Sequence, residues 1–248
     1  MTPDPHEAVV PACSPGPGAT RADRRDRELE RTFADLLEHD DRLAGGLRAR
    51  FDAGVAHLTG RVGCPAELVT ARELIGRLAG VHGVWDLVRV GDRPPPRALD
   101  LGCGAVRQHP GNAGIDRRRT TAVHVVADLA RGIPVADAAV DRVYAVHVLE
   151  HLPDYLPLLA ECHRVLRPDG VLHLLSPWWR HVNAVADPTH LRFFDVQTIK
   201  GICAQAPGGR RWFPELASCD GATVFADLRP LGPGDPDPDP HWLARFFD

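Results

Sequence analysis

The sequence lacks the features of a membrane-spanning, secreted or strongly basic protein. No stretch of its 248 residues approaches the roughly 20 apolar residues of a membrane span, and its first residues lack the basic start and apolar core of a secretory leader. Its six cysteines include no C-x-x-C pair, which argues against a disulfide framework and a structural zinc site. A net charge of −4 gives no general case for nucleic-acid binding. We therefore expect a soluble cytoplasmic protein.

The composition is that of a globular chain with flexible segments. Apolar residues make up 44% and charged residues 25%, both ordinary for a folded domain, and the length favours one main domain plus a smaller module. Residues 1–26 are rich in proline, glycine and charge, so we expect a disordered tail. The proline run of residues 92–97 is predicted to link two domains, and residues 231–240 to form a second, flexible linker.

Residues 27–91 are predicted to form a small α+β domain. Apolar residues at helical spacing indicate a helix ending near His39, and the alternation over residues 47–62 indicates a hairpin that turns at 52–54. Pro65 is expected to begin a second helix that Gly80 caps, and residues 84–90 to form a third strand.

This segment resembles the BON family, the bacterial OsmY and nodulation domain. Gly54, Val55, Leu58, Gly60 and Val62 match one conserved segment of that family, and the residues that match its closing segment are Val81, Gly83, Val84 and Val88. The resemblance implies a BON-like fold and a peripheral contact with a membrane, a hydrophobic ligand or a protein. The plain alternative is a small packing or interaction module.

Strands and helices alternate in the second half of the chain, which predicts a Rossmann-like, mainly parallel sheet of about seven strands over residues 98–230. Residues 241–248 are apolar and are expected to dock on this domain, as a last antiparallel strand. The predicted strands are 98–101, 113–115, 124–126, 140–146, 171–175 and 222–228, with helices at 152–166 and 196–206.

A glycine turn follows the first of these strands, at Gly102 and Gly104. Such a turn lets a ligand approach the backbone, which predicts a nucleotide-like cofactor. Asp116 comes only 12 positions after Gly104, too soon for a full crossover helix. A dinucleotide site uses the N-terminus of that helix to hold a pyrophosphate. The shortened crossover therefore favours S-adenosyl-L-methionine, which has no pyrophosphate.

Several motifs make this half resemble the class I S-adenosylmethionine-dependent methyltransferases, in particular the type 11-like group. They are "DLGCG" at residues 100–104, "GID" at 114–116, "DL" at 128–129, "VDRVYAVHVLEHL" at 140–152, "LRPDG" at 166–170 and "DPTHLRFFD" at 187–195. The resemblance implies a methyl transfer and a set of cofactor-binding residues: Asp100 near the methionine amino group, Gly102 and Gly104 at the turn, Asp116 on the ribose hydroxyls, and Asp128 with Leu129 at the adenine.

Each acidic residue of this set has a purely structural alternative. Asp100 could cap a turn, Asp116 could begin the basic loop of residues 117–119, and Asp128 could be a helix N-cap.

His147, Glu150 and His151 form an H-x-x-E-H motif, which matches an inverted zinc-protease motif on its own. Its place after a strand at the cofactor crevice argues against a protease. Ubiquinone-pathway O-methyltransferases and small-RNA 2'-O-methyltransferases use a similar set for a divalent ion, so a metal at Glu150 and His151, with His181 or His190 in addition, is an alternative. We expect no metal and assign His147 or His190 as the catalytic base, with His147 also lining the cofactor. A cofactor-packing role is the alternative for His147.

The acceptor pocket is predicted to include Trp178, Trp179, Phe193 and Phe194, although core packing explains these aromatic residues equally well. Arg192 could hold an anionic substrate group or pair with Asp195. We expect a small-molecule or lipid-like acceptor, methylated on oxygen in preference to nitrogen or carbon. The alternatives are a non-catalytic membrane- or partner-binding protein that uses the cofactor fold as a sensor or scaffold, and RNA methylation through the arginines at 117–119.

Overall fold

The computed structural model describes residues 21–40, 43 and 46–247, which form two compact units. The division falls between Arg93 and Pro94, inside the predicted linker. Residues 1–20 of the predicted tail lie outside the described residues. The last six residues of that prediction are wrong, because helix α1 (Arg21–His39) already begins at Arg21. Arginine and alanine favour the helix there, and Arg27 Nε donates to the Asp23 carbonyl one turn earlier.

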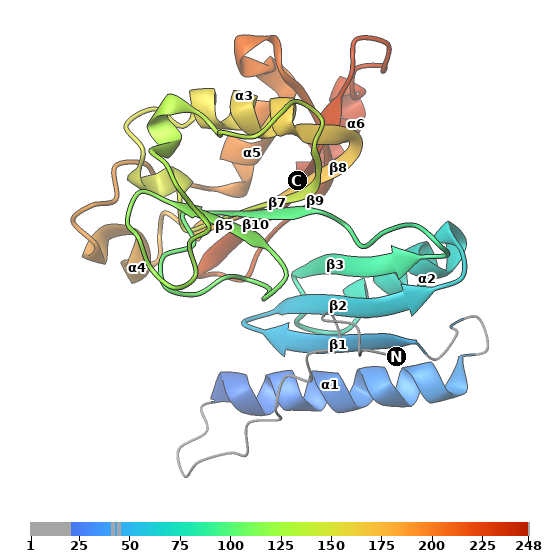
Figure 1. Cartoon of the computed structure of the whole chain (residues 1–248). Helices are drawn as coiled ribbons and strands as arrows, with labels where there is room; N and C mark the ends of the chain where they lie inside the picture. The colour runs from blue at the N-terminus through green and yellow to red at the C-terminus, as the bar shows by residue number, and fades with distance from the viewer. Residues whose placement is uncertain (1–20, 41–42, 44–45, 248) are drawn as a thin grey trace. The chain divides into compact units, whose positions relative to one another are not determined.

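The first unit has the predicted order of a helix, two strands, a helix and a strand. Strands β1 (Leu47–Asp52) and β2 (Val55–Val62) form an antiparallel hairpin, and β3 (Gly83–Val90) adds to β2 in parallel. The hairpin turns at Ala53 and Gly54, both at positive φ. Helix α1 lies along β1, and α2 (Pro65–Gly76) packs on β2 and β3 (Figure 1). Helix α2 ends at Gly76, four residues before the predicted cap.

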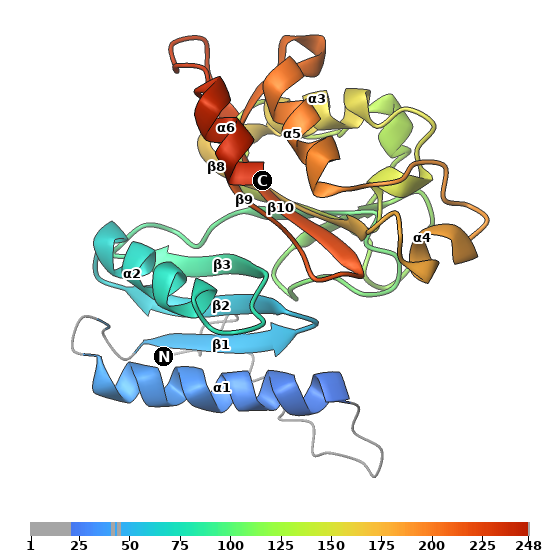
Figure 2. The same ribbon diagram turned by 180° about the vertical axis from the view of Figure 1, so that it is seen from behind.

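The second unit is built on a seven-stranded sheet in the order β6-β5-β4-β7-β8-β10-β9. β10 runs in the opposite direction to the other six strands of this sheet, so the predicted mainly parallel sheet is confirmed. Helices α3, α5 and α6 gather on one side of this sheet (Figures 1 and 2). The strands are β4 (Ala98–Leu101), β5 (Ala113–Asp116), β6 (Val125–Val126), β7 (Val140–Val146), β8 (Leu166–Pro177), β9 (Arg211–Cys219) and β10 (Thr223–Leu231), and the helices α3 (Leu156–Val165), α4 (Val182–Ala186), α5 (Val196–Gln205) and α6 (Pro240–Phe247).

The connection between β4 and β5 contains no helix, as predicted. Residues 102–112 form turns and bends, and both strands run parallel and adjacent. The chain then places β7 on the other side of β4. The strand order therefore reverses beside β4, and in parallel sheets ligands bind where the order reverses, at the carboxyl ends of the strands. The glycine turn lies at this edge.

The C-terminal segment is a helix, so the expectation of a last antiparallel strand is wrong. Asp239 Oδ1 caps α6 by accepting from the backbone N–H groups of His241 and Trp242 at 2.7 and 2.9 Å. Leu243 and Phe247 recur at a spacing of four and are buried in the core of this unit.

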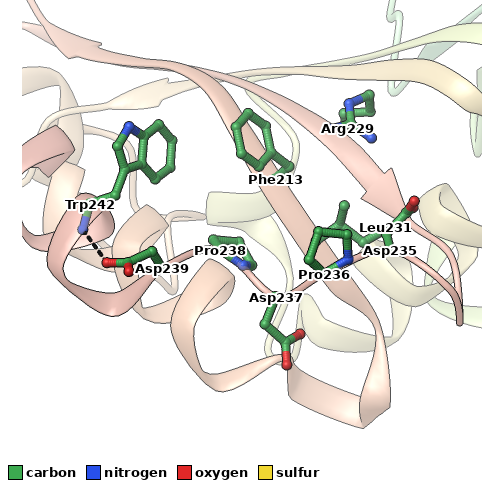
Figure 3. Close-up of a pocket in the computed structure, with 9 residues that line it drawn as sticks. All are labelled: Phe213, Arg229, Leu231, Asp235, Pro236, Asp237, Pro238, Asp239 and Trp242. Carbon is green, nitrogen blue, oxygen red and sulfur yellow. Dashed lines mark hydrogen bonds between the residues drawn. The ribbon is translucent and has the colours of Figure 1, made fainter.

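The segment before α6 is tethered, in contrast to the flexible linker that was predicted. Arg211 donates to the Asp235 carbonyl and to the Asp237 carboxylate, and the loop walls a shallow pocket of about 410 Å³ over the Phe213 and Trp242 rings (Figure 3). This pocket lies beside β9 and β10, which are separated from β4 in the sheet by β7 and β8. No helix among the described residues is long and apolar enough to span a membrane.

Candidate active site

The glycine turn after β4 needs its glycines for two different reasons. Both have positive φ, 59° at Gly102 and 56° at Gly104. A Cβ on Gly102 would lie 2.8 Å from the Val148 side chain, so the turn packs tightly against the residues that follow β7. A Cβ on Gly104 would meet nothing within 4 Å. The backbone at Gly104 is thus open to an approaching ligand.

Asp116 ends β5 and holds the glycine turn in place. Its Oδ2 accepts from the Gly104 N–H at 2.9 Å, and its Oδ1 accepts from the Arg118 N–H at 2.8 Å. Each carboxylate oxygen can accept more than one hydrogen bond, so both oxygens retain capacity for a pair of hydroxyl groups. The alternative role, the start of a basic loop, is also visible, because residues 117–119 follow directly and are exposed.

Asp100 is a deeply buried carboxyl group at this edge, with 1% of its surface exposed. Its Oδ2 accepts from the Gln108 N–H at 2.5 Å and from Asn112 Nδ2 at 3.3 Å. Burial raises the pKa of Asp100 from 3.8 to about 6, although these two hydrogen bonds and the nearby Arg107 lower it. A buried carboxyl group of this kind gains stability from a bound cation.

Asp128 occupies the N-cap position that was its structural alternative. Its Oδ1 accepts from the Ala130 N–H at 3.1 Å, at the start of a single helical turn, Leu129–Arg131. The Asp128 side chain is exposed, whereas Leu129 is buried. Capping uses Oδ1, and Oδ2 lies 3.6 Å from Arg131 Nε in an exposed ion pair, so an adenine amino group would compete with Arg131 for that oxygen.

His147 follows β7 in a conformation that histidine seldom adopts, with φ at 54°. Its Nδ1 lies 3.0 Å from Oε1 of Glu150, which is 1% exposed. Half of the His147 side-chain surface is exposed. If Nδ1 carries the proton and donates it to the carboxylate, Nε2 is left as an acceptor for an incoming proton. The strained backbone and the buried partner together fix the direction of the ring.

Glu150, His151 and His190 form a cluster in which one potential ligand atom from each lies within 4.8 Å of the others. The loop that carries His190 is held here because the Glu150 carbonyl accepts from Leu191 N–H at 2.7 Å. The Glu150 Oε2 atom is buried and has no hydrogen-bond partner among the described residues. One carboxylate and two imidazoles suit a divalent transition ion, so the residues fit the metal alternative. His181, the other extra candidate, instead caps α4 through the Asn183 N–H.

The predicted aromatic pocket separates into core and surface residues. Phe194 is fully buried, and Trp178 packs on the same core, whereas Trp179 and Phe193 are about half exposed. Both indole N–H groups donate to Asp195 Oδ2, at 2.8 Å from Trp178 and 3.1 Å from Trp179.

The pairing of Arg192 with Asp195, one of the two roles considered for this arginine, is wrong. Arg192 Nε donates to the Pro153 carbonyl at 2.8 Å. Asp195 is already engaged as the N-cap of α5, where its Oδ1 accepts from the Gln197 N–H. Arg192 therefore ties its loop to the segment after His151.

Comparison with known proteins adds to this geometry. A family model described as a methyltransferase domain matches residues 99–174, which run from β4 into β8. A probable S-adenosylmethionine-dependent methyltransferase from Mycolicibacterium smegmatis is 40% identical over 73 residues, covering 26% of this chain and 28% of that protein. Both findings are similarities to methyltransferases, and the second protein is named as dependent on S-adenosylmethionine.

Two further similarities are also to methyltransferases. A malonyl-[acyl-carrier protein] O-methyltransferase from Serratia marcescens is 30% identical over 131 residues, covering 40% of this chain and 51% of that protein. Among solved structures, a SAM-dependent methyltransferase from Aquifex aeolicus has a TM-score of 0.41 at 18% identity, covering 53% of this chain and 81% of that one. The chain spans between 28% and 51% of the length of the curated relatives it matches.

Sequence reasoning missed three residues of the candidate site. Gln108 and Asn112 both donate to Asp100, and Thr120 Oγ1 donates to the Gly104 carbonyl at 2.5 Å. Asn112 carried a readable signal, since a polar residue directly before a buried strand often serves a site. Gln108 acts through its backbone N–H, which nearly every residue type has, so the sequence does not identify this position.

Proposed function

We propose that this chain transfers a methyl group from S-adenosylmethionine to a small-molecule or lipid-like acceptor. The observation that carries the proposal is the arrangement at the carboxyl ends of β4 and β5. There the desolvated Asp100, the open backbone of Gly104 and the carboxylate of Asp116 lie next to the point where the strand order reverses. This set offers acceptors for an ammonium group and for a ribose diol, and it lacks a helix N-terminus for a pyrophosphate.

The bound cofactor would supply an activated methyl group on its sulfonium sulfur. We assign His147 as the catalytic base. Its Nε2 would accept the proton that the acceptor's hydroxyl group loses on methylation, and Glu150 would stabilise the resulting imidazolium through Nδ1. The remaining contribution is alignment of donor and acceptor and exclusion of water. His190 is the second candidate base, and it lies in the Glu150 cluster.

A divalent ion is the alternative that the geometry of the same cluster favours. Glu150, His151 and His190 would hold it, and it would supply Lewis-acid activation of an acceptor hydroxyl. The two schemes give opposite results with a chelator. Under the His147 scheme turnover persists after exhaustive chelation, whereas under the metal scheme it disappears and returns when Mg²⁺, Mn²⁺ or Zn²⁺ is added.

An apolar acceptor is favoured by the surface that adjoins the cluster. Five large apolar side chains between positions 179 and 193 are more than half exposed, namely Trp179, Val182, Val185, Leu191 and Phe193. Isolated exposed apolar residues are common, but five within fifteen positions are a concentration. The name of the Serratia relative, an O-methyltransferase, supports oxygen as the accepting atom.

For the first unit we propose a peripheral contact with a membrane or protein, through a BON-like fold. Its observed element order and its parallel β2–β3 pair agree with the segment matches described above. Vesicle co-sedimentation of the full chain tests the membrane contact. Sedimentation with neutral or anionic vesicles supports it, and exclusive recovery in the supernatant contradicts it.

Turnover is tested by incubating the protein with S-adenosylmethionine and fractionated cell extract and searching for products that gain a methyl group. Appearance of such a product, and its loss in His147→Asn, supports the enzyme; asparagine tolerates positive φ, so the backbone is preserved. Cofactor binding without transfer to any fraction would favour the sensor or scaffold alternative. RNA methylation, which we do not favour, predicts steeply salt-dependent RNA binding that is lost when the arginines at 117–119 are replaced.

A further inference from the structure

Helix α4 and the residues on either side of it carry an exposed apolar patch, and α4 lies apart from the row of α3, α5 and α6 (Figures 1 and 2). Val182 and Val185 are three positions apart, so they lie on one face of α4. His190 Nδ1 lies 3.1 Å from the Ala184 carbonyl, which ties the loop after α4 to this helix. Contiguous exposed patches of this kind mark contacts with proteins, membranes or ligands. The patch consists of five side chains that are between 51% and 64% exposed, namely Trp179, Val182, Val185, Leu191 and Phe193.

Backbone contacts bring the two ends of the patch together. Trp178 and Phe194 form a parallel bridge, and the Trp179 N–H donates to the Phe194 carbonyl at 2.9 Å. Successive side chains of an extended chain point to opposite sides. Because Trp178 and Phe194 pack on the core, their neighbours Trp179 and Phe193 lie on the outer side. The apolar patch is therefore one surface built from two segments.

Trp179 is held in place at this surface. Its indole N–H donates to Asp195 Oδ2 at 3.1 Å, and the same oxygen accepts from the Trp178 indole at 2.8 Å. The Arg180 guanidinium lies over both indole rings, 5.6 Å from the centre of Trp178 and 5.7 Å from that of Trp179. The polar edge of the Trp179 ring is thus occupied, while 52% of the residue stays exposed. An aromatic ring in this state suits the boundary between lipid headgroups and hydrocarbon.

The charges around the apolar patch are basic. Arg180 and Arg192 are exposed, and neither forms an ion pair within the part of the chain that the structure describes. Asp187 is the one acidic residue between positions 179 and 193. Its Oδ1 accepts from the N–H and the hydroxyl group of Thr189, and its Oδ2 lies 3.8 Å from His190 Nε2. An apolar surface beside unpaired arginines complements a bilayer with anionic headgroups.

We propose that the apolar patch docks the protein on a bilayer that contains anionic phospholipids. The five apolar side chains enter the boundary between headgroups and hydrocarbon, and Arg180 and Arg192 contact lipid phosphates. This contact goes beyond the proposed function, because it does not depend on methyl transfer, and it is separate from the contact proposed for the first unit. The Leu191 N–H donates to the Glu150 carbonyl at 2.7 Å, so a bilayer on the patch also adjoins the Glu150 cluster.

Co-sedimentation of the full chain with two kinds of vesicle tests the docking. One kind is phosphatidylcholine alone, and the other is phosphatidylcholine mixed with phosphatidylglycerol, which the wild type should prefer. The double variant Val182→Ser/Val185→Ser should partition at least about tenfold more weakly, because two inserted apolar side chains are lost. Val69→Ser, which changes a valine of α2 that is 55% exposed, should bind like the wild type. Arg180→Gln should reduce the preference for the mixed vesicles roughly fivefold, the effect of one charge at the lipid surface.

Quenching of tryptophan fluorescence by brominated phospholipids locates the contact independently of the serine variant. Mixed vesicles that carry brominated lipid should quench the wild type, and Trp179→Phe should lose most of this quenching while still sedimenting with the vesicles. Persistent quenching in Trp179→Phe overturns the inference.

Three results of the sedimentation experiment would also overturn the inference. The first is failure of the wild type to sediment with either vesicle. The second is binding by Val182→Ser/Val185→Ser that equals that of the wild type or of Val69→Ser, which would leave only the contact proposed for the first unit. The third is self-association of the wild type without vesicles that the double variant abolishes, because a second copy of the chain would then cover the patch.

Discussion

Replacing Asp100 by asparagine should make the folded protein more stable and the cofactor site weaker. The Asp100 carboxyl has a pKa of about 6 in the folded chain against 3.8 ordinarily, because it is buried. A native pKa above the unfolded value means that the native state binds the proton more tightly. The free energy of unfolding of the wild type therefore falls as pH rises from about 4 to about 6, and it levels off above that range.

The magnitude follows from the two pKa values. At pH 7 the ionised, desolvated carboxyl costs the fold about 3 kcal/mol, and at pH 4 about 0.5 kcal/mol. Asparagine loses one accepted hydrogen bond, which costs about 1 kcal/mol at any pH. Asp100→Asn should thus be about 2 kcal/mol more stable than the wild type at pH 7, with no advantage left at pH 4.

Urea unfolding of both proteins at several pH values between 4 and 8 measures this difference. Asp137→Asn serves as a matched control, because that carboxylate is 78% exposed and should show no such pH-dependent gain. Affinity for S-adenosylmethionine should fall in Asp100→Asn at pH 7. A stability difference that stays constant with pH would refute the buried-carboxyl reasoning.

Three further outcomes follow from the geometry. Gly102→Ala should lower the thermal midpoint more than Gly104→Ala, since only the former meets a neighbouring side chain, at 2.8 Å; equal shifts would contradict the assigned packing. Hydrogen bonds with Arg164 lower the pKa of Glu161 from 4.5 to about 2. The ionised Glu161 therefore stabilises the fold at pH values above 4.5, and this contribution is lost as pH falls toward 2. In Glu161→Gln the free energy of unfolding should therefore fall less between pH 4.5 and pH 2 than in the wild type, and an equal fall would contradict this role of Glu161. Glu150→Gln should reduce kcat, because the neutral amide stabilises the imidazolium formed at His147 less than the carboxylate does; an unchanged kcat contradicts this role.

The parallel sheet and its short first crossover could be predicted from the sequence because their signals are local. Buried strands read as apolar runs, and the distance from Gly104 to Asp116 limits what can lie between them. The C-terminal segment could not be assigned this way. Eight residues do not distinguish a strand from a helix by periodicity, and the cap at Asp239 that decides it lies in a segment that reads as a linker.

The candidate site was predictable as a set of residues but not as a set of contacts. The motifs named Asp100, Asp116 and His147, and the structure places all three at the carboxyl ends of their strands. Hydrogen bonds between segments distant in sequence carry no such pattern. The meeting of Glu150 with His190, forty positions apart, depends on backbone bonds from the loop before α5 to the Glu150 carbonyl.

Binding of S-adenosylmethionine to the full chain, followed by calorimetry, tests the central claim most directly. The wild type should bind at a 1:1 ratio. Asp116→Asn should bind at least tenfold more weakly, because its amide removes charge from the atoms that face the diol, while Asp52→Asn, an exposed carboxylate on β1, should bind like the wild type. Absence of binding by the wild type, or undiminished binding by Asp116→Asn, would contradict the assignment of the cofactor to the carboxyl ends of β4 and β5.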